Sequence, residues 1–196
     1  MDHDRNHCRG QAAQGSGPSS FWLQNPAPLF AAMALEKGMV FVDAGCGAGE
    51  YSLHAAKILG SEGRIFALDA RSRSVDWLNS RQPNTGEAPI TGLVCDITES
   101  LPLAAGQADV VMLGTVLHIR SVRDKADRLF SEIRRILRPE GMLAVLECKK
   151  EEADFGPPLL ARLSPEDVAA VAGPQGFRMV SELLQPYTYL ACFRPC

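Results

Sequence analysis

Three glycines stand at alternate positions and begin two residues after an acidic residue, in the run Asp43-Ala-Gly45-Cys-Gly47-Ala-Gly49. The three residues before this run are Val-Phe-Val, which favours a buried strand, and residues 51–59 place apolar side chains at helical spacing. Glycines between a strand and a helix let the backbone turn sharply and approach a ligand that lies over the helix N-terminus. The stretch therefore predicts the first half of a βαβ unit with a nucleotide-type binding site.

The spacing of these glycines distinguishes between two kinds of nucleotide. A dinucleotide-binding turn follows the pattern G-x-G-x-x-G or G-x-G-x-x-A, whereas the sixth position here is Glu50, whose charge would repel a pyrophosphate. The pattern D-x-G-x-G-x-G instead resembles motif I of the class I methyltransferases that depend on S-adenosylmethionine (AdoMet). The resemblance implies that the methionine portion of AdoMet lies against this loop, at Asp43, Gly45, Cys46, Gly47 and Gly49.

Acidic residues follow the next two predicted strands. Asp69 ends the run 63–69, about 20 residues after the glycine turn, where a carboxylate can accept hydrogen bonds from both ribose hydroxyls; it could instead cap the next helix. Asp96 follows the run 90–95 and precedes Leu-Pro, as in the same family, although it could be only a turn residue. The resemblance implies that Asp69 binds the ribose, that Ala70 lies beside the adenine, and that Asp96 and the backbone N–H of Ile97 bind the adenine.

Candidate groups for the reaction itself lie near the ends of two later predicted strands. The fourth strand is expected over residues 108–113, continuing through Gly114 to residue 119, and Gly114 is counted with the cofactor-binding residues. His118 is a candidate general base, or it packs at the strand end. Glu147 and Cys148 end the fifth strand, and a structural role is favoured for both. The family's N-P-P-Y or D-P-P-Y box is missing, which argues against exocyclic amines of DNA bases as acceptors.

The remaining elements can be placed by capping residues and apolar periodicity. A helix is expected to begin at Asn25-Pro26 and to end at Lys37-Gly38, a second to span residues 122–137, and a third to begin at Ser164-Pro165. Residues 176–183 and 187–193 predict two strands of a hairpin. From about residue 25 to 194 the chain resembles type 11 methyltransferases of the quinone-biosynthesis kind. This resemblance implies a single-domain α/β fold, Rossmann-like and doubly wound, whose seven-stranded sheet has the order 3-2-1-4-5-7-6 with strand 7 antiparallel.

Length and composition limit the other possibilities. The chain has 196 residues, which suits one compact domain over residues 21–196 preceded by a flexible leader over residues 1–20. That leader could fold over the site as a lid, with Phe21-Trp22 as an aromatic anchor or merely packed on the core. The net charge of -3 gives no basic footprint for DNA. No signal peptide and no apolar run of membrane-spanning length are found, so a cytoplasmic protein without membrane contact is expected.

Six cysteines occur without a C-x-x-C pair and are expected to remain thiols. His3, His7 and Cys8 could be metal ligands, but a closed site needs a fourth, so no metal is expected. The leading hypothesis is an AdoMet-dependent methyltransferase with a small-molecule acceptor that the sequence does not identify; the oligomeric state is likewise open. The alternatives are methylation of a soft centre helped by Cys8, Cys148 or Cys192, a non-catalytic AdoMet-binding or partner-binding module, and an NAD-dependent oxidoreductase.

Overall fold

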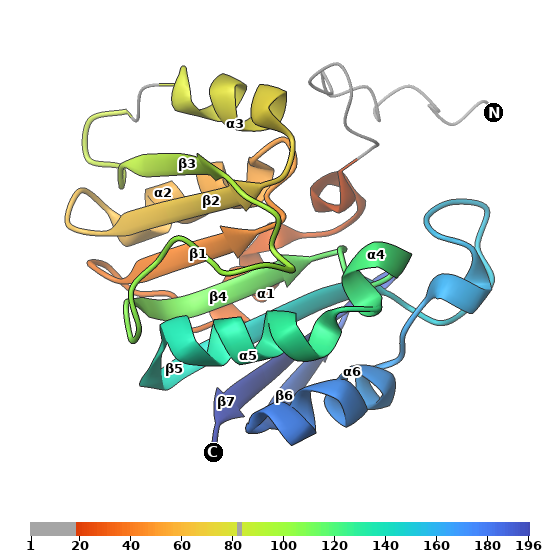
Figure 1. Cartoon of the computed structure of the whole chain (residues 1–196). Helices are drawn as coiled ribbons and strands as arrows, with labels where there is room; N and C mark the ends of the chain where they lie inside the picture. Colours follow the sequence, from red (N-terminus) through yellow and green to blue (C-terminus); the bar gives the residue numbers. More distant parts are fainter. Residues whose placement is uncertain (1–18, 82–83) are drawn as a thin grey trace, which may run out of the picture.

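The computed structural model describes residues 19–81 and 84–196, and its centre is one seven-stranded sheet (Figure 1). The strand order is β3-β2-β1-β4-β5-β7-β6, and β7 is antiparallel to both of its neighbours while the other pairs are parallel. The predicted strand order and the hairpin at the end of the chain are therefore confirmed. The strands are β1 (Val40–Ala44), β2 (Arg64–Asp69), β3 (Ile90–Val94), β4 (Ala108–Gly114), β5 (Leu137–Cys148), β6 (Phe177–Leu184) and β7 (Thr188–Pro195).

Helices of the described part of the chain cover both faces of the sheet. One apolar core lies between the sheet and the helices α5 and α6, and a second lies between the opposite face and the helices α1 and α2. Alternate residues of each central strand enter different cores, because successive side chains of a strand point to opposite faces. The helices are α1 (Pro26–Ala32), α2 (Glu50–Leu59), α3 (Ser72–Asn79), α4 (Arg120–Arg123), α5 (Ala126–Ile136) and α6 (Pro165–Ala172), with short 3-10 turns η1 (Ser20–Leu23), η2 (Leu159–Ala161) and η3 (Gly173–Gln175).

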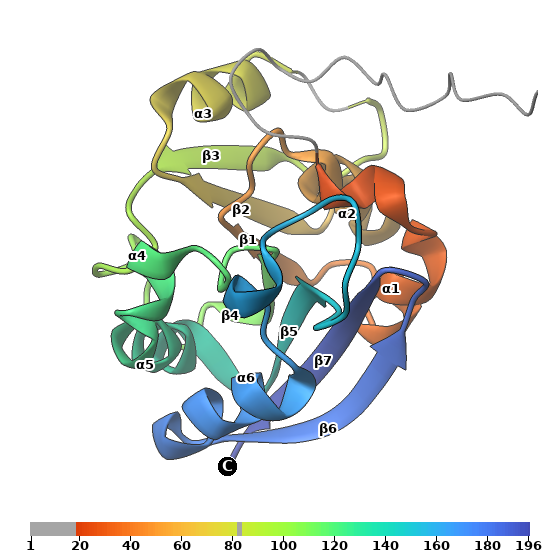
Figure 2. The ribbon, with the colours of Figure 1, turned by 90° about the vertical axis from the view of Figure 1, so that its right-hand side faces the viewer.

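The parallel strands end at a common edge, which faces the viewer in Figure 2. The turn η1, the short helix α4 and the loop that joins β5 to α6 gather at this edge, although they are far apart in the sequence (Figures 1 and 2). In open α/β sheets ligands bind outside the carboxyl ends of the strands. The fold thus brings the predicted site residues to the side where a site is expected.

Helix boundaries were predicted well where a side chain caps the helix. The Asn25 side chain accepts a hydrogen bond from Ala27 N at the start of α1. Ser164 and Asp167 form a reciprocal capping box at the start of α6, with Ser164 N donating to the Asp167 carboxylate at 2.9 Å. Each cap satisfies backbone N–H groups that have no partner within the helix.

Three predicted boundaries were wrong. The helix expected to reach Lys37 ends at Ala32, because the chain turns at Ala34 into a left-handed conformation with φ of 49°. The single helix expected over residues 122–137 is two, since Lys125 leaves the helical conformation between α4 and α5. The fourth strand stops at Gly114 rather than continuing to residue 119, because Thr115 adopts a φ of 53°. In each case a single residue leaves the helical or extended backbone conformation, while the apolar pattern of the sequence continues past it.

Candidate functional site

The glycine loop after β1 needs glycine for two different reasons. Gly45, Gly47 and Gly49 all have positive φ, of 82°, 55° and 81°. A Cβ on Gly45 would lie 2.5 Å from a methyl carbon of Val116, so at Gly45 the neighbouring side chain also excludes any other residue. At Gly47 the nearest atom to such a Cβ is the flexible end of Arg71, 3.6 Å away. Gly45 is therefore closed in by the core, whereas Gly47 faces open space.

That open space is a cavity of about 590 Å³ at the carboxyl ends of β1, β2 and β4. Small-molecule sites fall in this range of volume. Of the predicted site residues, Asp43 and Gly49 do not line it: Gly49 caps the N-terminus of α2, and Asp43 lies behind the loop. The cavity brings together the others, which are Gly45, Cys46, Gly47, Asp69, Ala70, Asp96, Ile97, Gly114 and His118.

Asp43 is buried and faces helix α2 instead of the cavity. Its carboxylate accepts a hydrogen bond of 2.7 Å from the Ser52 hydroxyl. Burial raises the pKa of Asp43 to about 6, and the Ser52 hydrogen bond opposes the shift without cancelling it. The carboxylate thus ties the end of β1 to the first turns of α2, on the far side of the glycine loop.

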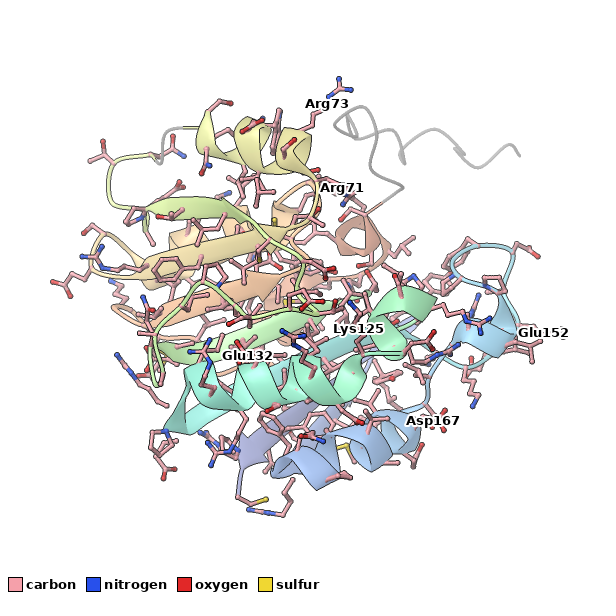
Figure 3. The ribbon with its side chains drawn as sticks, viewed as in Figure 1. Arg71, Arg73, Lys125, Glu132, Glu152 and Asp167 are labelled. Atoms are coloured by element: carbon pink, nitrogen blue, oxygen red, sulfur yellow. The ribbon has the colours of Figure 1, made fainter. Side chains whose placement is uncertain are left out.

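Asp69 stands at the end of β2 with both carboxylate oxygens engaged. Oδ2 accepts from Gly47 N at 2.9 Å and from Arg71 Nη2 at 3.2 Å, while Oδ1 accepts from Arg71 N at 2.9 Å and Arg71 Nε at 3.0 Å. Burial alone would raise the pKa of Asp69, but the hydrogen bonds from Arg71 and Gly47 outweigh it and lower the pKa. Arg71 itself lies at the cavity and is labelled in Figure 3.

Asp96 follows β3 and forms a turn with Thr98. Its Oδ1 accepts from Thr98 N at 2.9 Å and from the Thr98 hydroxyl at 2.7 Å. These hydrogen bonds lower the pKa of Asp96. Within residues 19–81 and 84–196 no group donates to Oδ2 of Asp96, and the side chain lines the cavity. Oδ1 thus stabilises the turn, and Oδ2 is left to accept a hydrogen bond from a ligand.

His118 and Glu147 meet at the opposite side of the cavity. His118 Nδ1 lies 3.1 Å from Glu147 Oε2, and Glu147 Oε1 accepts from Leu117 N at 2.7 Å. Glu147 is buried, with only 1% of its surface exposed, whereas His118 lines the cavity. The sequence proposed both residues as candidates, but it gave no sign that they form a pair.

A hydroxyl cluster that the sequence did not indicate closes one end of the cavity. The Ser20 hydroxyl lies 2.9 Å from the Tyr51 hydroxyl and 3.2 Å from the Thr115 hydroxyl, and all three residues line the cavity. Gln24 also donates to Tyr51, at 2.6 Å. Of the three, only Tyr51 could have been expected near the site from the sequence, because it is the first apolar residue of the helix that follows the glycines. Thr115 depends on a left-handed backbone that no motif announces.

The aromatic pair in η1 divides between two environments. The Phe21 ring packs edge-on against Tyr51 with centroids 5.2 Å apart, so Phe21 anchors η1 to the core. Trp22 is 63% exposed. Ser19 and Ser20, placed in the leader by the sequence, are described and line the cavity; Ser20 is buried. Residues 1–18, which include His3, His7 and Cys8, lie outside the described residues.

The thiols of residues 19–81 and 84–196 do not gather around one site. Cys46, Cys148 and Cys192 are buried, and burial raises the pKa of each. Cys192 pairs with Ala144 in the β5–β7 register, four residues along β5 from Cys148, which separates them by about 13 Å along the strands. In the described part of the chain no three His, Cys, Asp or Glu residues are grouped to hold a metal ion. These positions give no support to the soft-centre alternative.

The loop between β5 and α6 is organised by one buried arginine. The Arg162 guanidinium donates to the backbone carbonyls of residues 149, 151, 155 and 157, at distances from 2.6 to 3.1 Å. Arg123 of α4 reaches the carbonyl of Ala161 at 3.5 Å. Because these bonds fix its backbone, the loop follows a defined path at the carboxyl edge of the sheet (Figure 2).

No helix among residues 19–81 and 84–196 is long and apolar enough to cross a lipid bilayer.

Comparison with known proteins gives consistent results. The model of the type 11 family, described as a methyltransferase domain, matches residues 42–145. The chain is 29% identical over 116 residues to the ubiquinone/menaquinone biosynthesis C-methyltransferase UbiE of Haemophilus ducreyi, covering 59% of this chain and 44% of that protein. It is 30% identical over 115 residues to the demethylmenaquinone methyltransferase of Staphylococcus aureus, covering 59% and 45%. The chain spans about half the length of the curated relatives it matches.

A solved structure is similar along nearly the whole chain. The crystal structure of a SAM-dependent methyltransferase from Aquifex aeolicus superposes with a TM-score of 0.80 and 24% identity, covering 92% of this chain and 95% of that one. This likeness extends the shared fold beyond residues 42–145, which the family model matches.

Proposed function

The chain belongs to the type 11 methyltransferase-domain family, and from this premise we propose that it binds AdoMet and transfers its methyl group to a small-molecule acceptor. The observation that carries the proposal is the cavity between the glycine loop and the ends of β2 and β3. This cavity holds an acidic residue at each of the two strand ends, Asp69 and Asp96, in the order that an extended nucleoside requires. An NAD-dependent oxidoreductase is disfavoured, because Glu50 also lines this cavity where a pyrophosphate would lie.

The residues present fit the proposed cofactor. Gly47 leaves space into which a Cβ would project, so a ligand can approach the backbone of the loop. Asp69 offers two acceptor oxygens for the two hydroxyls of a ribose, and Asp96 Oδ2 offers an acceptor for an exocyclic amine. When bound, AdoMet supplies a methyl group on a positively charged sulfur, so that the protein's main task is to hold the acceptor in line with it.

Arg71 must give way for Asp69 to serve in this role. It donates to both oxygens of the Asp69 carboxylate, which are the atoms that ribose hydroxyls would use. Its side chain is 48% exposed and can turn into solvent without breaking any packing in the core. In the proposal Arg71 therefore occupies Asp69 before the cofactor binds, and the sugar hydroxyls replace its hydrogen bonds one for one.

The acceptor that we propose is a small aromatic molecule of the quinone type. The relatives named above are methyltransferases of ubiquinone and menaquinone biosynthesis, and this supports such an acceptor for this chain. The net charge of -3 gives no support to DNA as the acceptor. We also propose that residues 21–196 form the catalytic domain, that residues 1–20 act as a leader, and that the protein works in the cytoplasm.

Calorimetric titration with AdoMet, S-adenosylhomocysteine and NAD tests the cofactor. We expect saturable binding of the first two and none of NAD. Asp69→Ala should weaken AdoMet binding by about 1–3 kcal/mol, because a charge-assisted hydrogen-bond pair is lost. Arg71→Ala keeps the carboxylate and removes a competing donor, so this variant should bind AdoMet at least as tightly as wild type.

Two results would contradict these assignments. If NAD alone bound, the cofactor would be wrong. If Arg71→Ala weakened AdoMet as much as Asp69→Ala does, the ion pair rather than the free carboxylate would be what the cofactor needs. Transfer of a labelled methyl group to 1,4-dihydroxynaphthalene, measured with the wild type, tests the acceptor class separately.

A further inference from the structure

The two oxygens of the Glu147 carboxylate contact two consecutive residues, Leu117 and His118, in the segment that follows β4. Leu117 N donates to Oε1 at 2.7 Å, and His118 Nδ1 lies 3.1 Å from Oε2. The chain reaches this position because β4 ends at Gly114 and Thr115 turns it with a φ of 53°. Glu147 lies at the end of β5, the neighbouring strand, so the pair joins two strand ends at the cavity.

The environment of Glu147 determines which nitrogen of His118 carries the proton. An ionised carboxylate can only accept hydrogen bonds, so Nδ1 must be the donor in the contact with Oε2. A neutral imidazole with its proton on Nδ1 has an unprotonated Nε2. Among the described residues nothing donates to Nε2 or accepts from it, and the His118 side chain is 23% exposed at the cavity wall. The free lone pair is thus available to a ligand in the cavity.

A purely structural role does not explain the choice of Glu at this position. Burying a carboxylate costs several kcal/mol, and one backbone N–H offsets only part of that. A glutamine would satisfy Leu117 N equally well without a charge. What the charge adds is the orientation of the His118 ring, the fixed position of its proton, and stabilisation of the ring once it becomes positively charged.

We infer that Glu147 is the positioning residue for His118, and that His118 Nε2 is the base that takes the proton of an ionisable hydroxyl group on the acceptor. The inference rests on the proposed methyltransferase function and narrows its substrate class. An acceptor such as a tertiary amine or a thioether has no proton to lose and needs no base. The pair therefore points to a phenol, an enol or a hydroquinone.

The proton and electron balance of the step is simple. The O–H bond of the acceptor breaks and its proton goes to Nε2, which leaves the electron pair on the acceptor oxygen. The electron pair of the acceptor anion would form the new bond to the methyl carbon, and the sulfur of AdoMet would keep the electron pair of the broken C–S bond. The products are the methylated acceptor, S-adenosylhomocysteine and one proton, which His118 returns to solvent. No oxidant or reductant is required.

The position of the proton on His118 can be measured without any turnover. Protein labelled with ¹⁵N-histidine gives long-range ¹H–¹⁵N spectra that distinguish the two tautomers, and His118→Gln identifies the signals of this ring. We expect the Nδ1–H form in the wild type. In Glu147→Gln the amide oxygen accepts from Leu117 N and the amide NH₂ faces Nδ1, so the ring should change to the Nε2–H form. A wild-type ring in the Nε2–H form would overturn the inference.

Kinetics with 1,4-dihydroxynaphthalene as acceptor provide the second test. His118→Gln and Glu147→Gln should each lower kcat by about 100-fold or more, the usual contribution of a general base. AdoMet affinity should stay within about threefold of wild type in both. His54→Gln is a matched control, because its ring stacks on Phe30, with centroids 4.6 Å apart, and does not line the cavity.

The two hypotheses fail in different ways. Failure of the wild type to bind AdoMet would count against the proposed function, whereas the tautomer of His118 does not depend on the cofactor. A His118→Gln variant with wild-type kcat would overturn the inference while leaving AdoMet-dependent transfer intact. Transfer to a thioether probe but not to the hydroxyl probe would also overturn it.

Discussion

Replacing Gly45 by alanine should destabilise the protein much more than the same replacement at Gly47. Both residues belong to one loop and both have positive φ, so each substitution carries the cost of a left-handed alanine, about 1–2 kcal/mol. At Gly45 the new Cβ would also lie 2.5 Å from a methyl carbon of the buried Val116, which must move by about 1 Å. Forcing an extra methyl group into a packed site costs about 1–3 kcal/mol more.

Gly47→Ala has no comparable second cost. Its Cβ would meet only the end of the Arg71 side chain, at 3.6 Å. We therefore expect a loss of about 2–5 kcal/mol for Gly45→Ala and about 1–2 kcal/mol for Gly47→Ala. Because the methyl group of Ala in Gly47→Ala would project into the cavity, this variant should lose more AdoMet affinity than Gly45→Ala although it loses less stability.

Urea unfolding followed by circular dichroism measures this difference directly. In thermal unfolding a difference of about 1–3 kcal/mol corresponds to roughly 2–12 °C for a chain of this size. Equal losses of unfolding free energy in the two variants, or a larger loss for Gly47→Ala, would refute the argument that Val116 leaves no room for a side chain at Gly45. An AdoMet affinity reduced at Gly45 but not at Gly47 would refute the argument that Gly47 faces the ligand.

Two buried or partly buried carboxyl groups should give the stability opposite dependences on pH. Burial raises the pKa of Asp43 from 3.8 to about 6, so its contribution to the free energy of unfolding is fully present below pH 3.8 and is lost as the pH rises through 6. In Asp43→Asn the free energy of unfolding should no longer fall over this range. The difference from wild type should change by up to ~3 kcal/mol between pH 4 and 7, measured by urea titration at each pH. Glu132 of α5 has a pKa lowered from 4.5 to about 2, chiefly by hydrogen bonds from Arg135, so its contribution is present above pH 4.5 and lost as the pH falls through 2. Glu132→Gln should flatten the acid side of the curve of unfolding free energy against pH, and an unchanged slope in either variant would contradict its assignment.

The sequence predicted the sheet well because its elements depend on local pattern. Strand ends, a glycine turn and capping residues such as Asn25 and Ser164 act over a few residues, and the resemblance to the family supplied the order of the strands. The position of Asp69 and Asp96 at the cavity could be expected because parallel strands place their carboxyl ends at one edge. Asp43 could not be placed from its motif, since whether it faces the ligand or α2 depends on the direction of its side chain at the end of β1.

Two features that the sequence missed depend on contacts between distant segments, and a third is a local break in a helix. The Ser20, Tyr51 and Thr115 hydroxyls come from three elements, and their meeting follows from the docking of η1. The His118–Glu147 pair requires both the end of β4 at Gly114 and its register with β5. The break at Lys125 leaves the apolar spacing of Val122 and Ala126 unchanged, so periodicity alone predicted one continuous helix.

The way in which Arg162 holds the loop between β5 and α6 has a consequence for how the sequence of this loop can change during evolution. The guanidinium holds the loop between β5 and α6 through carbonyl oxygens, which every amino acid provides, and not through side chains. A residue such as Glu151 can therefore be exchanged while the path of the backbone is kept, whereas Phe155 also packs edge-on against Tyr187. Selection could change the side chains of this loop one substitution at a time, provided that the single arginine is retained.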